Sequence, residues 1–170
     1  LSQEAGLVPI VEPEVLMDGS HDIHRCFDVT EATLTAVFRE LRDQNVILEG
    51  MLLKPNMVIS GKESLNRANA KEVADATIRC FQSCVPSSVP GIVFLSGGQT
   101  DEEATVNLDA INRRTGEFPW EMSFSYGRGL QATPLKIWAG KAENLGKAQD
   151  SLLVRAKLTS AARDGNYSSG

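Results

Sequence analysis

Four short apolar runs, separated by longer stretches with helical periodicity, are the feature that most constrains the fold of this chain. The runs cover residues 7–11, 46–53, 91–95 and 120–124. Runs of this length, bounded by turn residues, are typical of buried strands. Strands that alternate with helices favour a parallel sheet with right-handed crossover connections. The sequence therefore predicts an α/β fold, and its length of 170 residues favours a single domain.

Helical segments are expected between and after these strands. Thr30 is a candidate N-cap for the first helix, and Thr100 with Glu103 forms a capping-box pattern for the third. In the last helix, Leu152 and Leu153 are among the residues expected to pack against the core. The helices are predicted over residues 30–42, 70–84, 100–113, 130–138 and 144–162.

Polar side chains follow the predicted strands at their carboxyl ends. Glu12, Lys54 and Ser96 end the first three strands at intervals of about 42 residues, and Arg128 follows the fourth about 32 residues later. The carboxyl ends of parallel strands meet at one rim, where α/β proteins gather their functional groups. We therefore expect a carboxylate, an amine, a glycine-containing loop and a guanidinium at one rim.

Lys54 stands where a lysine is unexpected, because it ends an apolar run and precedes Pro55. Burial disfavours the ammonium form, and a neutral amine is a nucleophile. Glu12, at the end of the neighbouring strand, is placed for acid/base work, and Glu14 lies two residues further on. The alternative is that Lys54 extends to solvent and that the two glutamates form a solvated pair.

Two glycine-containing turns follow the third and fourth predicted strands, Ser96-Gly97-Gly98 and Gly127-Arg128-Gly129. Glycine lets the backbone approach an anion, and the helix that follows points its amides at that anion. These turns therefore predict a phosphate site. The alternatives are that the first is only a turn and helix cap, and that Arg128 pairs with a surface carboxylate. An amine nucleophile, a base and a phosphate anchor together indicate a Schiff-base lyase acting on a phosphorylated ketose.

Composition and charge exclude other classes of function. The net charge is -5 and the pI about 5.1, which argues against a nucleic-acid partner. Basic residues are scattered, so the sequence does not indicate a membrane surface, and no apolar run approaches the ~20 residues of a membrane span. Three cysteines, Cys26, Cys80 and Cys84, do not make a disulfide framework and favour a reducing, cytoplasmic compartment.

A short His-x-x-His-x-Cys stretch is the sole pattern that suggests a metal. It comprises His21, His24 and Cys26, in a polar segment that leads into a helix. A tetrahedral site needs four well-spaced ligands, so no metal is expected here. Cys80 and Cys84 share one helical face and are expected to be packed thiols, while Trp120 and Trp138 are expected in the core or at an interface.

Several long motifs closely resemble the class I fructose-bisphosphate aldolases, and the resemblance extends over residues 6–167. The motifs are residues 8–14, 48–58, 94–99 and 124–128. The resemblance implies that Lys54 is the Schiff-base lysine, Glu12 the general acid/base and Glu14 a second active-site carboxylate. It also implies two phosphate-binding segments, which comprise Ser96, Gly97 and Gly98 in one and Ser125, Gly127 and Arg128 in the other.

The same resemblance implies a reaction and an architecture. Members of the family cleave fructose 1,6-bisphosphate to dihydroxyacetone phosphate and glyceraldehyde 3-phosphate in glycolysis and gluconeogenesis, without a metal, and no cofactor is expected. They are usually homotetramers. Their fold is a (β/α)8 TIM barrel, of which this chain corresponds to strands five to eight. Residues 1–170 are thus expected to form the C-terminal half of one barrel domain, with 163–170 as a flexible tail.

Half a barrel leaves two strands as unpaired edges, so we expect the isolated chain to be incomplete and inactive. Two other functions remain open at this point. The chain could be a non-catalytic fragment that acts as a binding or antigenic module. It could also belong to a related Schiff-base lyase that uses another ketose phosphate.

Overall fold

The computed structural model describes residues 1–168 and contains a four-stranded sheet in the order β1-β2-β3-β4. Every neighbouring pair is parallel, so the predicted α/β architecture is confirmed. Each of the first three strands is followed by a crossover segment that contains a helix, as a parallel sheet requires. The strands are β1 (Ile10–Val11), β2 (Leu52–Leu53), β3 (Gly91–Phe94) and β4 (Glu121–Phe124).

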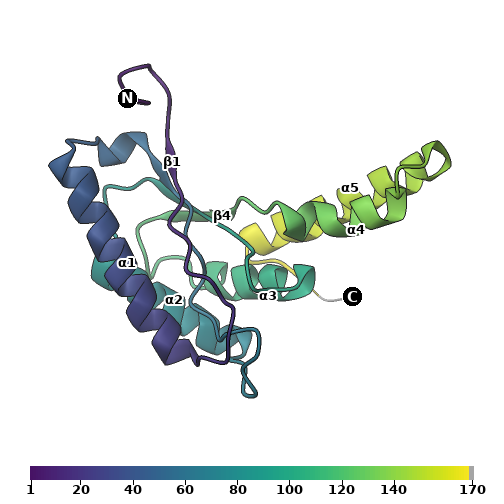
Figure 1. Ribbon diagram of the computed structural model, residues 1–170, viewed down its shortest axis with the longest axis horizontal. Helices are drawn as coiled ribbons and strands as arrows, with labels where there is room; N and C mark the ends of the chain where they lie inside the picture. Colours follow the sequence, from purple (N-terminus) through teal and green to yellow (C-terminus); the bar gives the residue numbers. More distant parts are fainter. Residues whose placement is uncertain (169–170) are drawn as a thin grey trace.

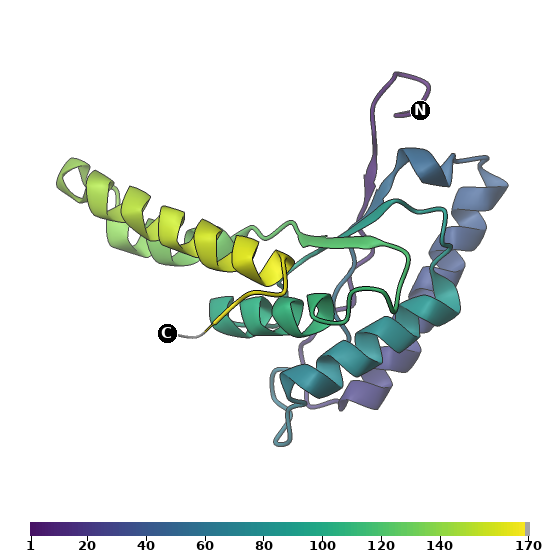
Figure 2. The same ribbon diagram turned by 180° about the vertical axis from the view of Figure 1, so that it is seen from behind.

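The helices pack against one another in a row, α1 on α2, α2 on α3 and α3 on α5, with α4 against α5. Figures 1 and 2 show α4 and α5 as a pair that projects away from the sheet. The elements are α1 (Ile23–Asp43), α2 (Ala70–Cys84), α3 (Asp101–Asn112), α4 (Arg128–Trp138) and α5 (Leu145–Arg163), with short 3-10 helices η1 (Leu48–Gly50) and η2 (Ala142–Asn144).

The strand register divides the sheet into a covered face and an open face. Leu53, Ile92 and Met122 are cross-strand partners and are buried. On the other face Ile10 pairs with Leu52 and is half exposed. Because side chains alternate along a strand, residues two positions further on continue the same face. The open face is therefore the one that leads to the carboxyl ends of β1 and β2 at residues 12 and 54.

Aromatic rings fill the centre of the core between α2 and the sheet. The rings of Phe81 and Phe94 stack with centroids 5.8 Å apart, and Trp120 meets Phe81 edge-on at 6.5 Å. The indole of Trp120 also donates to the carbonyl of Pro86, so its predicted place in the core is confirmed. Trp138, by contrast, is partly exposed near the end of α4.

Helix α1 begins earlier than the sequence predicts. Its N-cap is Asp22, whose carboxylate accepts from the amide of Arg25 at 2.8 Å. Thr30 is a buried residue in the middle of the helix, and its hydroxyl accepts from the side-chain amide of Asn56. The prediction of Thr30 as N-cap is wrong because Ile23, Cys26 and Phe27 continue the apolar spacing of the helix on its N-terminal side and pack against the core.

The apolar run at 46–53 is a strand only at its end, over Leu52–Leu53. The preceding residues turn through η1, and Gln3 satisfies part of their backbone. Its side-chain oxygen accepts from the amide of Ile47, while its amide nitrogen donates to the carbonyls of Ile47 and Gly50. A side chain from the N-terminal segment thus replaces the strand partner that the prediction assumed.

The buried stripe of α5 also differs from expectation. Ala148, Thr159 and Ala162 are buried, whereas Leu152 and Leu153 are exposed. Beyond the helix, Tyr167 folds back onto α3, since its amide donates to the Asp109 carboxylate at 2.8 Å. Part of the tail predicted to be flexible therefore has defined contacts, while residues 169–170 of that prediction lie outside the described residues.

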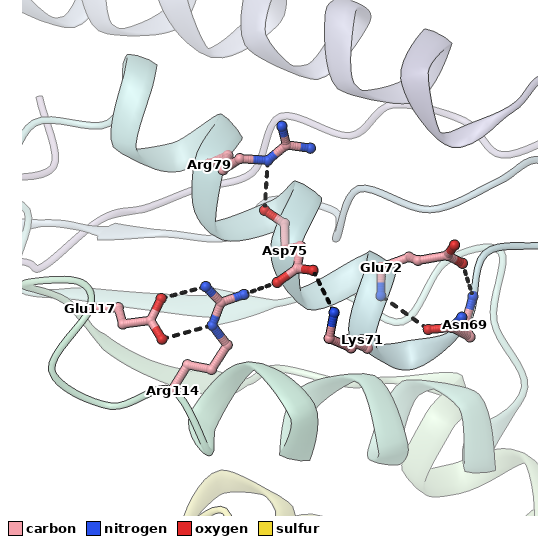
Figure 3. A network of polar contacts seen from close by, with 7 residues as sticks. All are labelled: Asn69, Lys71, Glu72, Asp75, Arg79, Arg114 and Glu117. Atoms are coloured by element: carbon pink, nitrogen blue, oxygen red, sulfur yellow. Dashed lines mark hydrogen bonds and ion pairs between the residues drawn. The ribbon is translucent and has the colours of Figure 1, made fainter.

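Polar contacts join α2 to the segment that follows α3, as Figure 3 shows. Arg114 forms ion pairs with Asp75 of α2 and with Glu117. At the start of α2, Asn69 and Glu72 form a reciprocal capping box. Helix α3 has the same kind of capping box, formed by Thr100 and Glu103. The capping box defines the first residue of each of these two helices.

Candidate active site

Lys54 and Glu12 meet at the carboxyl ends of β2 and β1. The register that pairs Ile10 with Leu52 continues beyond the strands, and the amide of Lys54 donates to the carbonyl of Val11 at 2.8 Å. Their side chains lie on the open face of the sheet, with Lys54 Nζ 3.0 Å from Glu12 Oε1. The lysine side chain is 19% exposed and the glutamate 47%. An amine is thus largely buried beside a carboxylate that solvent can reach.

Glu14 lies next to the first glycine turn. A Cβ placed on Gly97 would come within 2.7 Å of Glu14 Oε1, so the Glu14 carboxylate lies against this glycine. The segment that carries Glu14 is held by the buried side chain of Asn56, whose oxygen accepts from the amide of Val15 at 3.0 Å. The structure therefore brings Glu14 to the loop after β3, while Glu12 lies beside Lys54.

The two glycine turns come together, as the sequence predicts. A Cβ on Gly129 would lie 3.1 Å from Ser96 Oγ, which places the loops after β3 and β4 in contact. Ser96, Gly98, Arg128 and Gly129 line one cavity of about 380 Å³. The cavity adjoins the start of α3, where the amides of Thr100 and Glu103 are bonded within the capping box and Asp101 and Glu103 line the cavity.

Arg128 and Ser125 flank the second turn. Arg128 is the first residue of α4, is exposed, and forms no ion pair within residues 1–168. Ser125 continues β4, with its amide bonded to the carbonyl of Phe94, and Gly127 is the N-cap residue of α4. Between them, Tyr126 is buried and donates to the carbonyl of Ala104. Burial raises the pKa of its phenol, so Tyr126 is a packing residue.

Two basic residues that the sequence analysis did not single out also line the cavity. They are Lys62 and Arg67, from the segment between β2 and α2. Arg67 donates to the carbonyl of Gly98 at 3.3 Å and pairs with Glu103 at 3.3 Å. The available signal was their position in a loop that follows the Lys54 strand, because such loops share the rim.

The His-x-x-His-x-Cys stretch, at which no metal was expected, does not form a cluster of ligands. His24 is exposed on α1, while the thiol of Cys26 is buried and donates to the sulfur of Met17 at 3.8 Å. Within the described residues, no group of three or more His, Cys, Asp or Glu side chains is arranged around a metal position. Cys80 is buried and Cys84 partly buried, with the Cys84 thiol donating to the carbonyl of Cys80.

Comparison with known proteins identifies the family of this chain. The family described as "Fructose-bisphosphate aldolase class-I" matches residues 1–170. Fructose-bisphosphate aldolase 4, cytosolic, of Arabidopsis thaliana is 56% identical over 98% of this chain and 42% of its own length. The cytoplasmic isozyme of Cicer arietinum is 56% identical over 98% of this chain and 46% of its own length. The chain therefore spans about half the length of the curated relatives it matches.

A solved structure gives the same result at the level of the fold. Fructose-bisphosphate aldolase from Plasmodium falciparum, in complex with TRAP and a small molecule inhibitor, superposes with a TM-score of 0.94 at 50% identity. The match covers 99% of this chain and 48% of that chain. Within residues 1–168, none of the helices combines the length and the apolar character needed to cross a membrane. The chain belongs to the class I fructose-bisphosphate aldolase family.

Proposed function

We propose that this chain supplies the Schiff-base half of an aldolase that cleaves fructose 1,6-bisphosphate. The observation that carries the proposal is the contact of 3.0 Å between Lys54 Nζ and Glu12 Oε1, on the open face of the sheet. It lies at the carboxyl ends of β1 and β2, and the two glycine loops follow the carboxyl ends of β3 and β4. The amine of Lys54 attacks the ketose carbonyl, and loss of water leaves an iminium. Glu12 takes a hydroxyl proton from the substrate, the carbon–carbon bond breaks, and its electrons pass to the iminium.

The phosphate loops orient the substrate for this step. Ser96, Gly97 and Gly98 with Ser125, Gly127 and Arg128 bind one phosphate of the substrate, through backbone amides and the guanidinium. Because the bound phosphate holds the substrate in place, the ketose carbonyl is aligned with the Lys54 amine. Glu14, next to Gly97, keeps this loop in position. No step of this scheme requires a metal or a cofactor.

The active form is a complete (β/α)8 barrel, in which residues 1–170 contribute strands five to eight. The open edges of β1 and β4 and the open face of the sheet support this proposal. The resemblance implies a homotetramer, and the cytosolic names of the relatives support a cytosolic location. The products, dihydroxyacetone phosphate and glyceraldehyde 3-phosphate, place the reaction in glycolysis and gluconeogenesis.

Borohydride trapping tests the nucleophile. The chain, alone and co-expressed with the N-terminal half of the Arabidopsis relative, is incubated with dihydroxyacetone phosphate and reduced. Peptide mass spectrometry should find the adduct on Lys54 and none in Lys54→Met. Lys71→Met, which changes an exposed lysine of α2, should leave the adduct unchanged. An adduct on a different lysine, or full turnover by Lys54→Met, would overturn the assignment.

Relative turnover on fructose 1,6-bisphosphate and fructose 1-phosphate then defines the substrate. Faster cleavage of the bisphosphate supports the proposed reaction, whereas preference for the monophosphate indicates a related ketose-phosphate lyase. Binding of phosphate esters without any adduct or turnover in the assembled barrel would favour a non-catalytic binding module.

A further inference from the structure

Arg155 is a charged residue on the buried stripe of α5. It lies seven residues after Ala148 and four before Thr159, which is the spacing of one helical face. Its side chain is only 12% exposed. A guanidinium in such a place is destabilising unless its N–H groups find acceptors. The acceptors that bind the Arg155 guanidinium therefore explain how this charge is tolerated.

Those contacts reach the starts of two other helices. Arg155 Nε and Nη2 donate to the carbonyl of Gly129, in the first turn of α4, at 3.2 and 3.1 Å. Nη2 also donates to the carbonyl of Asp101, the first residue of α3, and to Thr105 Oγ1, both at 3.0 Å. The Asp101 carboxylate lies 4.0 Å from Nε. One side chain of α5 thus joins the N-termini of α3 and α4.

These two helix starts follow the two glycine loops of the proposed phosphate site. Gly129 also touches Ser96, since a Cβ there would lie 3.1 Å from Ser96 Oγ. The separation of the helix starts determines whether their amides converge on one anion. Arg155 sets this separation because its planar fork binds carbonyl groups of both.

We propose that Arg155 is a positioning residue that holds the starts of α3 and α4 together as one phosphate cradle. The inference rests on the proposed function, because it assigns a role in the same phosphate site. Arg155 is not itself a lining residue of the cavity, but it binds the carbonyls of Gly129 and Asp101, which both line it. Lysine retains the charge at this position but lacks the fork, so it should restore the arrangement only in part.

Hydrogen exchange tests the structural part on the 170-residue chain. Arg155→Met should increase amide exchange in residues 96–101 and 127–131 together. Arg163→Met is the matched control, because Arg163 lies on the same helix and pairs instead with Glu121 and Asp164. Unchanged exchange in both loops of Arg155→Met, or an equal increase in Arg163→Met, would overturn the positioning role.

Borohydride trapping with two reagents tests the functional part. With dihydroxyacetone phosphate, Arg155→Met should label Lys54 more slowly, by up to about a hundredfold, since a misplacement of about 1 Å can lower a rate by that factor. With dihydroxyacetone, which has no phosphate, labelling should not change. Arg155→Lys should fall between wild type and Arg155→Met.

The outcomes separate the two proposals. Equal losses with both reagents mean that Arg155 supports the fold in general, and equal labelling of all variants with dihydroxyacetone phosphate means that it does not act on the phosphate. Either result overturns the inference. A wild-type chain and assembled barrel that label with neither reagent contradict the proposed function instead, while the exchange measurement still decides the positioning role.

Discussion

At the scale of single residues, the proposed role of Glu12 depends on its contact with Lys54. Its carboxylate lies beside the Lys54 amine and is half exposed, so it can exchange protons with both the substrate and solvent. Glu14, only two residues away, is instead directed to Gly97. Two carboxylates of one short segment therefore have different partners, and the proposed scheme assigns the proton transfer to Glu12.

Replacing Glu12 by glutamine should separate Schiff-base formation from cleavage. Dihydroxyacetone phosphate should still label Lys54, because the amine remains, but cleavage of fructose 1,6-bisphosphate should fall by about 10²–10⁴-fold, the usual effect of losing a general base. Steady-state turnover of the assembled barrel measures this loss. Glu143→Gln, on the projecting helix pair, should retain wild-type turnover. Unchanged cleavage by Glu12→Gln would assign the proton transfer to a different group.

Single residues were predictable where their chemical type was unusual for their position. Lys54 after an apolar run and glycines after strands stand out in the sequence, and the structure places them at one rim. Arg155 was missed because a lone arginine in a helix is usually at the surface. The signal was its spacing from Ala148, Thr159 and Ala162, but Leu152 and Leu153 suggested a different buried face.

At the scale of elements, Gly98 fixes the turn from β3 into α3. Its φ is +78°, and a Cβ there would lie 2.4 Å from the Cβ of Met17. Gly140, between α4 and η2, has a similar φ of +73° but no atom within 4 Å of such a Cβ. The two glycines thus share a backbone conformation and differ in their surroundings.

Gly98→Ala should lower the free energy of unfolding more than Gly140→Ala. The left-handed conformation alone costs alanine about 1–2 kcal/mol, and a crowded contact adds about 1–3 kcal/mol. Urea denaturation of the assembled barrel measures both variants. Equal losses would mean that the segment carrying Met17 moves aside without penalty.

Helices and strands were predictable where their own residues determine their type and bounds. Helix α3 begins at the capping box predicted from Thr100 and Glu103, α2 covers the predicted residues, and β3 and β4 lie within the predicted runs. The run at 46–53 did not form a full strand because Gln3, far away in sequence, satisfies its backbone. Contacts of that kind cannot be read from local periodicity.

At the scale of the whole molecule, the sheet ends in an apolar edge. Leu7, Val8 and Ile10, in and before β1, are all more than half exposed. Unpaired strand groups beside exposed apolar side chains favour association with further strands. The barrel that the family implies would close this edge with a strand that residues 1–168 do not contain.

The 170-residue chain should therefore self-associate when it is expressed alone. Sedimentation velocity should detect assemblies larger than the monomer, and Ile10→Lys should reduce them by placing a charge at the edge. Leu65→Lys is the control, because Leu65 is fully exposed in a loop away from β1. A monodisperse monomer that melts cooperatively would contradict the prediction, whereas a 1:1 complex with the N-terminal half of the Arabidopsis relative would support it.

The hydrogen bonds from α5 to the starts of α3 and α4 also imply an effect of phosphate binding on α5. Binding free energies are linked, so whatever tightens one end of a coupled pair must tighten the other by the same amount. A phosphate held between the two loops would draw Gly129 and Asp101 onto Arg155 and thereby stiffen the projecting helix pair. The most distant part of this half barrel would then report, through its own rigidity, whether the substrate site is occupied.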